Sequence, residues 1–513
     1  MVFFLLGSIT AENVFLSPVL AQTTQTEREK ELLAIISNTD EDSRERAAAH
    51  VLLGIYYGDL LRHSLAEKEC EKALDIYRKL TKDQPGNYFP DIAFVLTVFG
   101  IIHNNMKQYQ LAEKDYTEVL EIFRELGKDQ PEVYLPHIAN TLINLGCVHA
   151  IMNRHSLAEK ECTEALGIYC ELGKDQPEVY LSRIADTLNN LGNIHNNMKQ
   201  YSLAEKEFTE TLEIHRKLVK AQPEVYLPKV ATTLNNLGGA HRNLKQYSLA
   251  EKYLTETLEI RHKLAKAQPE VYLPHIANTL INLGSVHDDM NRHSLAEKEL
   301  TEALEIYREL AEKQPEVYLP KVALTLNNLG VVHQKMNQYP LAEKESTEAL
   351  EIRRKLAKAQ PEVYLPEVAT TLEILAVLHE KMKQSLKSAT EYDELAVIQR
   401  LIAKYRKEAR PKLAETLVKL AELNRDAKND PTEADKAYSE ALEIYKELAK
   451  EQPKTYQWEL CETALASAKL LLENEMDLKR GQALLKEAKD IAANAEDLRA
   501  KELLQRIGEL EKK

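Results

Sequence analysis

Glycine is scarce in this sequence, with only 16 residues in 513. Such a composition leaves little room for the turns of β-sheets or for Gly-rich phosphate-binding loops, and neither a Gly-Lys-Ser/Thr loop nor a Gly-x-Ser-x-Gly elbow occurs. Alanine, leucine, glutamate and lysine dominate, which favours helices. The sequence therefore predicts an all-α protein that is not an enzyme, with no catalytic residue and no cofactor.

Cysteine is also scarce. The five residues are odd in number and lack the spacing of metal ligands, and three of them fall in a single repeat. We interpret them as small apolar core residues, so neither a metal site nor a disulfide framework is predicted. They are Cys70, Cys147, Cys162, Cys170 and Cys461.

Positive charge is not concentrated anywhere. The formal net charge is −14, and lysine and arginine alternate with glutamate throughout the chain. This pattern argues against nucleic acid as a partner, because phosphate binding needs a local basic surface. Beyond the N-terminus no run of 18 apolar residues occurs, so no membrane span is predicted in the body of the chain.

The N-terminal segment 1–22 is a possible leader. Residues 1–21 are apolar and free of lysine and arginine, and Val19-Leu20-Ala21 before Gln22 fits a small-residue cleavage site. However, a basic start is missing, and Glu12 and Asn13 interrupt the apolar run. Two locations stay open: exported or periplasmic if the segment is a signal peptide, and cytoplasmic otherwise.

A Gln-Pro pair marks a repeat of 46 residues. In the unit that begins at Pro131, apolar residues follow helical spacing in two blocks, Ile138–His149 and Leu157–Tyr169. The pattern predicts two antiparallel helices, with Pro136 in the first turn of the first helix and Ser156 capping the second. The prolines of the pair are Pro85, Pro131, Pro177, Pro223, Pro269, Pro315, Pro361 and Pro453.

The period also predicts the organisation of the chain. About eight regular repeats fill residues 41–406, after an N-terminal linker or helix at 23–40. Residues 407–452 form a degenerate repeat, and the hairpin near 383–394 is irregular. A capping hairpin and helix are expected at 453–513, as at the end of a repeat array.

Small and apolar residues recur at fixed places in the unit. The set Leu142-x-x-Leu145-Gly146-x-x-His149, followed by Ala158 and Ala165, returns with the same spacing in later repeats. It resembles the tetratricopeptide repeat, and the long unit with Thr-Leu-Asn-Asn-Leu-Gly is most similar to the kinesin-light-chain-like subclass. The resemblance implies a right-handed α-solenoid, a superhelix of stacked antiparallel helix hairpins.

Asparagine recurs just before the Leu-Gly pair, in an arrangement that we call the asparagine ladder. Asparagine is a mediocre helix former, and its amide donates and accepts as a peptide group does. The resemblance places it on a concave groove, where it implies a grip on the backbone of a bound peptide. The alternative is that these amides tie neighbouring repeats together or are merely solvated. The ladder comprises Asn144, Asn190, Asn236, Asn282 and Asn328, with a second set at Asn189, Asn235 and Asn327.

Side chains at the end of the first helix vary between repeats that are otherwise nearly identical. Units 131–176 and 269–314 differ at only nine of 46 positions, and three of these lie at this place. Residues such as Arg242, Asp288 and Asp289 are therefore predicted to add selectivity for ligand side chains. Drift at exposed positions is the alternative explanation.

A histidine also recurs in the first helices, but we interpret it as structural. Neighbouring helices lie about 8–10 Å apart, whereas a zinc ion needs each nitrogen at about 2 Å. The Glu159-Lys160-Glu161 run of the second helix is interpreted as a solvated outer face. The histidines are His103, His149, His195, His241, His287, His333 and His379.

These features together predict a non-enzymatic scaffold that holds a protein or an extended peptide. Two other functions stay open, a structural spacer or self-assembling rod and a regulatory module that responds to a peptide. A spacer has no need of the asparagine ladder. The partner and the oligomeric state cannot be read from the sequence.

Overall fold

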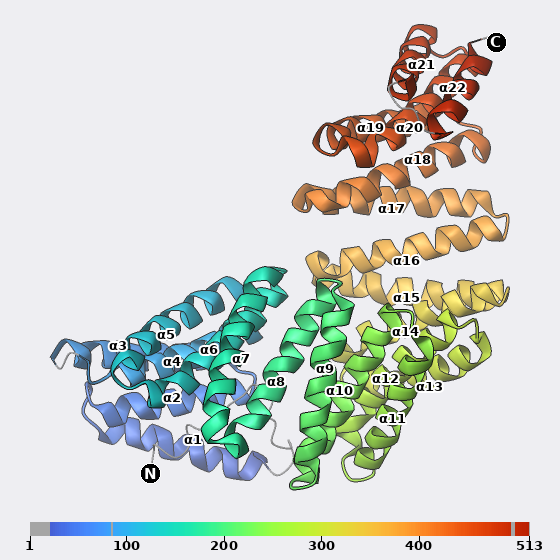
Figure 1. The fold of residues 1–513 in the computed structure, drawn as a ribbon. Coiled ribbons are helices and arrows are strands. Elements are labelled where there is room, and N and C mark those ends of the chain that lie inside the picture. The colour runs from blue at the N-terminus through green and yellow to red at the C-terminus, as the bar shows by residue number, and fades with distance from the viewer. Residues whose placement is uncertain (1–20, 84–85, 494–497, 512–513) are drawn as a thin grey trace. The chain divides into compact units, whose positions relative to one another are not determined.

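The computed structural model describes residues 21–83, 86–493 and 498–511, which are helical throughout and contain no β-strand. The prediction of an all-α solenoid of repeats is confirmed (Figure 1). Of the predicted leader at 1–22, residues 1–20 lie outside the described ranges. Among the described helices, none combines the length and the apolar character that a membrane crossing requires.

Helices α1 to α11 belong to a first compact unit, which ends at Ile260 within α11. Consecutive helices pack on one another, as α6 does on α7 and α7 on α8. Their bounds are α1 Ala21–Asn38, α2 Arg44–Asp59, α3 His63–Asp83, α4 Phe89–Asn105, α5 Tyr109–Asp129, α6 Pro131–Ile151, α7 His155–Asp175, α8 Pro177–Asn197, α9 Tyr201–Val219, α10 Pro223–Asn243 and α11 Tyr247–Ala265.

The second compact unit begins at Arg261 and has the same internal order of packing. Its helices are α12 Pro269–Asp289, α13 His293–Lys313, α14 Pro315–Lys335, α15 Tyr339–Ala359, α16 Pro361–Lys381, α17 Ser385–Tyr405, α18 Arg410–Asp426, α19 Pro431–Glu451, α20 Pro453–Glu473, α21 Leu478–Ala493 and α22 Leu498–Leu510, with a short 3-10 segment at Lys407–Ala409.

The Gln-Pro pair separates the hairpins as the sequence indicates. Helix α7 ends at Asp175, and Gln176 caps both α7 and the following α8, whose first residue is Pro177. Proline suits this first position, because its missing N–H would have no helical partner there.

Two details of the hairpin differ from the prediction. Helix α6 begins at Pro131, so Pro136 lies inside the helix. Because proline has no backbone N–H, the carbonyl of Glu132, four residues earlier, lacks its helical hydrogen bond. Glu132 is exposed to solvent. Helix α7 begins at His155, so Ser156 is not its cap. The turn closes earlier because Asn153 takes a positive φ of 58° and the N–H of Arg154 bonds to the carbonyl of His149 at 2.8 Å.

The ends of the chain depart from the regular hairpins. Helix α1 begins at Ala21, two residues before the segment 23–40 predicted as a linker or helix, and ends within it at Asn38. The degenerate repeat at 407–452 contains α18 and α19, and the capping segment contains α20, α21 and α22. These last three helices share one buried cluster with α18 and α19, which includes Leu465, Leu485 and Leu503.

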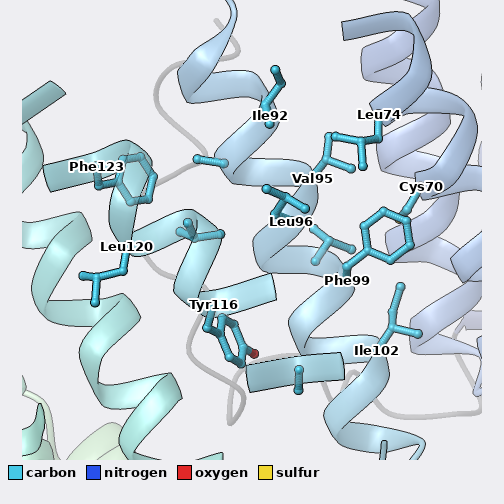
Figure 2. Close-up of a cluster of buried hydrophobic side chains, with 14 of the residues drawn as sticks. Cys70, Leu74, Ile92, Val95, Leu96, Phe99, Ile102, Tyr116, Leu120 and Phe123 are labelled. Carbon is cyan, nitrogen blue, oxygen red and sulfur yellow. The ribbon is translucent and has the colours of Figure 1, made fainter. Parts of the chain in front are cut away.

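The core lies between neighbouring hairpins. Figure 2 shows α4 contributing Val95, Leu96 and Phe99 between side chains of α3 and side chains of α5, with Phe99 directed toward Cys70. These residues are all buried, and each large apolar side chain contributes about 1.5–3 kcal/mol by leaving water. A hairpin therefore depends on the next hairpin for much of its core.

The glycine of the Leu-Gly pair permits close contact within a hairpin. A Cβ atom built on Gly146 of α6 would lie 2.8 Å from Sγ of Cys162 and 3.3 Å from the carbonyl oxygen of Ala158. Built on Gly192 of α8, it would lie 2.5 Å from Cε1 of Phe208. The predicted close approach of the two helices at Gly146 and Ala158 is confirmed.

Replacing Gly192 by alanine is expected to destabilise the first unit by about 1–3 kcal/mol, because the ring of Phe208 must move. Gly167 of α7 is the matched control, since no atom lies within 4 Å of its built Cβ. Gly167→Ala is expected to stabilise by about 0.5–1 kcal/mol through helix propensity. Urea denaturation of both variants measures the difference, and equal effects would contradict the packing account.

Candidate peptide-binding surface

The asparagine ladder lies on one face of the first helices of the hairpins. In α6, Asn144 is followed at helical spacing by Cys147 and Ile151, which are both exposed. Residues three, four and seven apart share one side of a helix, so these side chains form a single stripe. We call the corresponding stripe on all first helices the first-helix face.

First helices also contact one another directly. In the first unit α6 lies beside α8 and α8 beside α10, and in the second unit α12 lies beside α14 and α14 beside α16. Within each unit the ladder positions therefore form a row, of three asparagines in the first unit and two in the second.

Three asparagines of the ladder keep their amides open. Asn144, Asn190 and Asn328 are partly buried, and in the part of the chain that the structure describes their side chains make no hydrogen bond. Each amide has a donor and an acceptor that are available to another molecule.

Other amides bond across the repeats. Asn236 donates from Nδ2 to Oδ1 of Asn189 at 3.0 Å, and Asn243 donates in the same way to Asn196 at 3.0 Å. Each bond joins α8 to α10. These asparagines therefore join neighbouring repeats, which is the alternative role that the sequence left open for them.

The remaining predicted asparagines differ in environment. Asn327 is buried, and its Nδ2 donates to Oγ1 of Thr371 at 3.1 Å while its Oδ1 lies buried without a partner. Its amide therefore faces the interface with α16. Asn235 and Asn282 are partly buried and interact with other groups of the chain.

The variable positions are also engaged within the protein. Oδ2 of Asp288 lies 2.6 Å from Nζ of Lys335 in the next repeat, and its Oδ1 lies 3.0 Å from Nδ1 of His293. Arg242 and Asp289 likewise interact with other groups of the chain. The pair Asp288–Lys335 has the same spacing of 47 residues as Asn196–Asn243. Part of the variation at this place therefore reflects pairing between repeats.

The histidines make contacts that the sequence did not indicate. Nδ1 of His149 lies 2.8 Å from Oε2 of Glu161 in its own hairpin, and Nε2 lies 3.1 Å from Oε1 of Glu113 in the preceding one. His195 is placed similarly between Glu207 at 2.8 Å and Glu159 at 3.2 Å. The interpretation of the run 159–161 as a solvated face is wrong for Glu161, which is 14% exposed, and holds in part for Glu159, which meets a buried histidine while 39% of its side chain stays exposed.

Neighbouring carboxylates raise the pKa of two histidines. The pKa of His103 is raised, chiefly because its Nδ1 bonds to Asp115 at 2.6 Å, with a further contribution from Glu67. For His195 burial lowers the pKa, but Glu207 and Glu159 together raise it by more. Each of these imidazole rings lies between carboxylates of two second helices, and its protonated form would bridge them.

One histidine lacks this arrangement. Twelve residues after His241, where the other repeats have a carboxylate, stands Tyr253. The rings of His241 and Tyr253 stack with their centroids 5.2 Å apart. Its Nδ1 bonds instead to Oε1 of Gln246 at 2.6 Å, and Glu205 lies 3.9 Å from its Nε2. Across the described ranges, no group of three or more histidine, cysteine, aspartate and glutamate side chains is placed to hold a metal ion.

Comparison with known proteins identifies tetratricopeptide repeats in part of the chain. Models described as "Tetratricopeptide repeat" match residues 183–263, 229–309 and 322–360. No curated protein matches the sequence. The kinesin-light-chain-like subclass is tested by none of these matches and stays a prediction.

Several solved structures are similar in part. The apo form of the quorum sensor NprR from B. thuringiensis is 14% identical, with 83% of this chain and 99% of that chain covered and a TM-score of 0.46. Aspartyl phosphate phosphatase F from Bacillus subtilis is 16% identical, with 84% and 96% covered and a TM-score of 0.43. BtubC (BKLC) from P. vanneervenii is 21% identical, with 48% and 92% covered and a TM-score of 0.40.

The assignment rests on the family models and on the repeat itself. The matched residues contain the Leu-Gly pair and the small alanine of the second helix, and the matched helices form the hairpins described above. Residues 183–309 and 322–360 of the chain are therefore built of tetratricopeptide repeats.

Proposed function

We propose that this protein is a scaffold that holds an extended segment of a partner protein on its first-helix face. The open amides of Asn144 and Asn190 would grip the main chain of that segment in the first unit, and Asn328 would do so in the second. The observation that carries the proposal is that these amides share one helical register and have no hydrogen bond within the described chain.

Amide chemistry favours a main-chain ligand. A peptide group offers one N–H and one C=O, and the asparagine side chain complements both. Within the described chain, none of the three amides has a buried atom without a partner, so they are open to solvent in the free protein, and a bound backbone would replace water there. Recognition of this kind tolerates many sequences, because every peptide carries the same groups.

Selectivity would come from side chains near the open amides. On α6 the neighbours are Cys147 and Ile151, which are small or apolar and exposed. Next to Asn190 on α8, the amides of Asn189 and Asn196 are already bonded to α10. We therefore propose that the first unit accepts uncharged residues of the partner at this place.

Cys147 and Cys170 are exposed, so the interpretation of the cysteines as core residues is wrong for these two, and they allow a direct test. Cys147 lies on the first-helix face, three residues after Asn144, whereas Cys170 lies on the second helix α7 of the same hairpin. An environment-sensitive fluorophore on Cys147 is expected to change its emission when peptides selected from a random library with the full chain are added. The same fluorophore on Cys170 is expected to change little.

Each label requires a variant in which the other exposed cysteine is serine. A response from Cys170 with none from Cys147 would place the peptide elsewhere and contradict the proposal. So would a library that yields no binding peptide under conditions in which the protein keeps its helical content.

A further inference from the structure

Helix α17 carries an apolar ridge on its solvent side. Val397, Leu401 and Tyr405 follow one another at intervals of four residues, and 54%, 42% and 86% of their surfaces are exposed. Side chains four residues apart form one ridge of a helix surface. The other face of the helix is buried through residues such as Leu395 and Ile398.

The same three positions are polar or small in the other second helices. They are Glu351, Lys355 and Ala359 in α15, and Glu305, Glu309 and Lys313 in α13. Those helices pack in the stack without an apolar ridge, so stacking does not require one. The ridge of α17 is therefore an addition to the repeat, and it leaves large apolar side chains in water.

Positive charge gathers at one end of the ridge. Lys404, Arg406 and Lys407 surround Tyr405 and are exposed, and in the described ranges none of them makes an ion pair. The acidic groups at the opposite end already have partners. Asp393 bonds to Lys428 at 2.5 Å, and Glu394 bonds to Arg354.

We propose that the ridge of α17 is a docking surface for an amphipathic helix of a partner protein, with acidic residues at the end that meets Tyr405. Apolar side chains of the partner would lie beside Val397, Leu401 and Tyr405, as ridges of one helix pack into grooves of another. Carboxylates of the partner would pair with Lys404, Arg406 and Lys407. This surface is separate from the first-helix face.

A second copy of the chain and a lipid bilayer fit the ridge less well than an acidic amphipathic helix. A second copy would have to offer several acidic groups to the basic end, but Asp393 and Glu394 of α17 are already paired, which leaves Glu408 as the one exposed carboxylate that the described chain has beside the ridge. The ridge spans only about 12 Å at 1.5 Å per residue, which is short for the 1,200–2,000 Å² or so of a stable dimer. An anionic bilayer would repel a chain whose net charge is −14.

The test uses the full chain and a synthetic helix labelled with fluorescein. The peptide has leucines on one face and glutamates at one end, and a matched peptide has lysines in place of the glutamates. Fluorescence anisotropy is expected to show binding of the glutamate peptide, with at least tenfold weaker binding of the lysine peptide.

Two variants of the protein locate the site. The triple variant Val397→Glu, Leu401→Lys and Tyr405→Ala introduces the residues of α15, so its fold is expected to survive. It is expected to weaken binding of the glutamate peptide at least tenfold. The variant Lys404→Gln, Arg406→Gln and Lys407→Gln keeps the ridge and is expected to reduce the preference for the glutamate peptide over the lysine peptide.

Four results would overturn the proposal. One is equal binding of the glutamate peptide by the wild type and the triple variant, with helical content unchanged. Another is no binding of this peptide by the wild type. The third is a dimer in sedimentation that the triple variant abolishes, which would assign the ridge to a second copy. The fourth is binding to anionic vesicles that depends on the ridge, without binding of the peptide.

Discussion

Replacing His103 by alanine is expected to lower the free energy of unfolding of the first unit by about 3 kcal/mol below pH 6.5 or so. The imidazole lies between Asp115 of its own hairpin and Glu67 of the preceding one, with 8% of its side chain exposed. Removing it leaves two carboxylates that face each other across the helix interface without a cation. Urea denaturation followed by circular dichroism measures the loss.

The loss of stability in His103→Ala should become smaller as pH rises. The pKa of His103 is raised in the folded protein, chiefly by its hydrogen bond to Asp115. A raised pKa means that the charged form contributes stability below the pKa of the unfolded chain, and that this contribution disappears as pH rises through the folded pKa. The difference between the wild type and His103→Ala should therefore shrink above neutral pH.

His241 supplies the matched control for this experiment. It occupies the same register in the same unit, but it stacks on Tyr253, and its one nearby carboxylate, Glu205, is 3.9 Å away. His241→Ala is expected to cost less than His103→Ala at low pH, because it leaves no close pair of carboxylates. An equal loss in the two variants, or a His103→Ala loss that grows with pH, would contradict the electrostatic account.

The repeat period alone predicts most of the fold. Gln-Pro every 46 residues marks the start of the hairpins that begin with α6, α8, α10, α12, α14 and α16, and the small residues Gly146 and Ala158 mark the contact inside one of them. The helix ends are less predictable. A positive φ at Asn153 ends α6, and α7 then begins at His155 without a side-chain cap. Such a backbone turn leaves little trace in composition.

The partners of the histidines could not be read from local sequence. Glu159 and Glu161 stand in an alternating Glu-Lys run, which is typical of a solvated helix face. The contact of Glu159 with His195 spans 36 residues and arises only when hairpins stack, whereas the contact of Glu161 with His149 spans 12 residues and arises when the two helices of one hairpin pack. Spacing between repeats is the signal that would have found them.

Spacing between repeats also gives information on the two candidate surfaces. Complementary residues 47 positions apart, such as Asp288 and Lys335, indicate pairing across repeats rather than ligand selectivity. The ridge of α17 can likewise be found by aligning repeats, because Val397 stands where the other second helices mostly carry a carboxylate. Which ladder amides are open depends on side-chain geometry, which repeat alignment alone does not supply.

The double variant Asn144→Ala and Asn190→Ala is expected to weaken binding of library-selected peptides by tenfold or much more. Each substitution leaves peptide groups of the ligand unpaired in a partly buried place, at about 1–3 kcal/mol each, and about 1.4 kcal/mol is tenfold in affinity. Neither side chain bonds within the described chain, so the fold loses no intramolecular hydrogen bond. Isothermal titration measures the affinity, and circular dichroism confirms the helical content.

A second double variant separates ligand binding from the joining of repeats. Asn189→Ala with Asn236→Ala removes a 3.0 Å hydrogen bond between α8 and α10, and both amides are already engaged there. It is expected to lower the stability of the first unit by about 0.5–1.5 kcal/mol and to change peptide affinity less than the first pair does. Full-strength binding by Asn144→Ala with Asn190→Ala, at unchanged helical content, would mean that the open amides do not contact the peptide. The ladder would then serve the stack alone, as the bond between Asn189 and Asn236 already does.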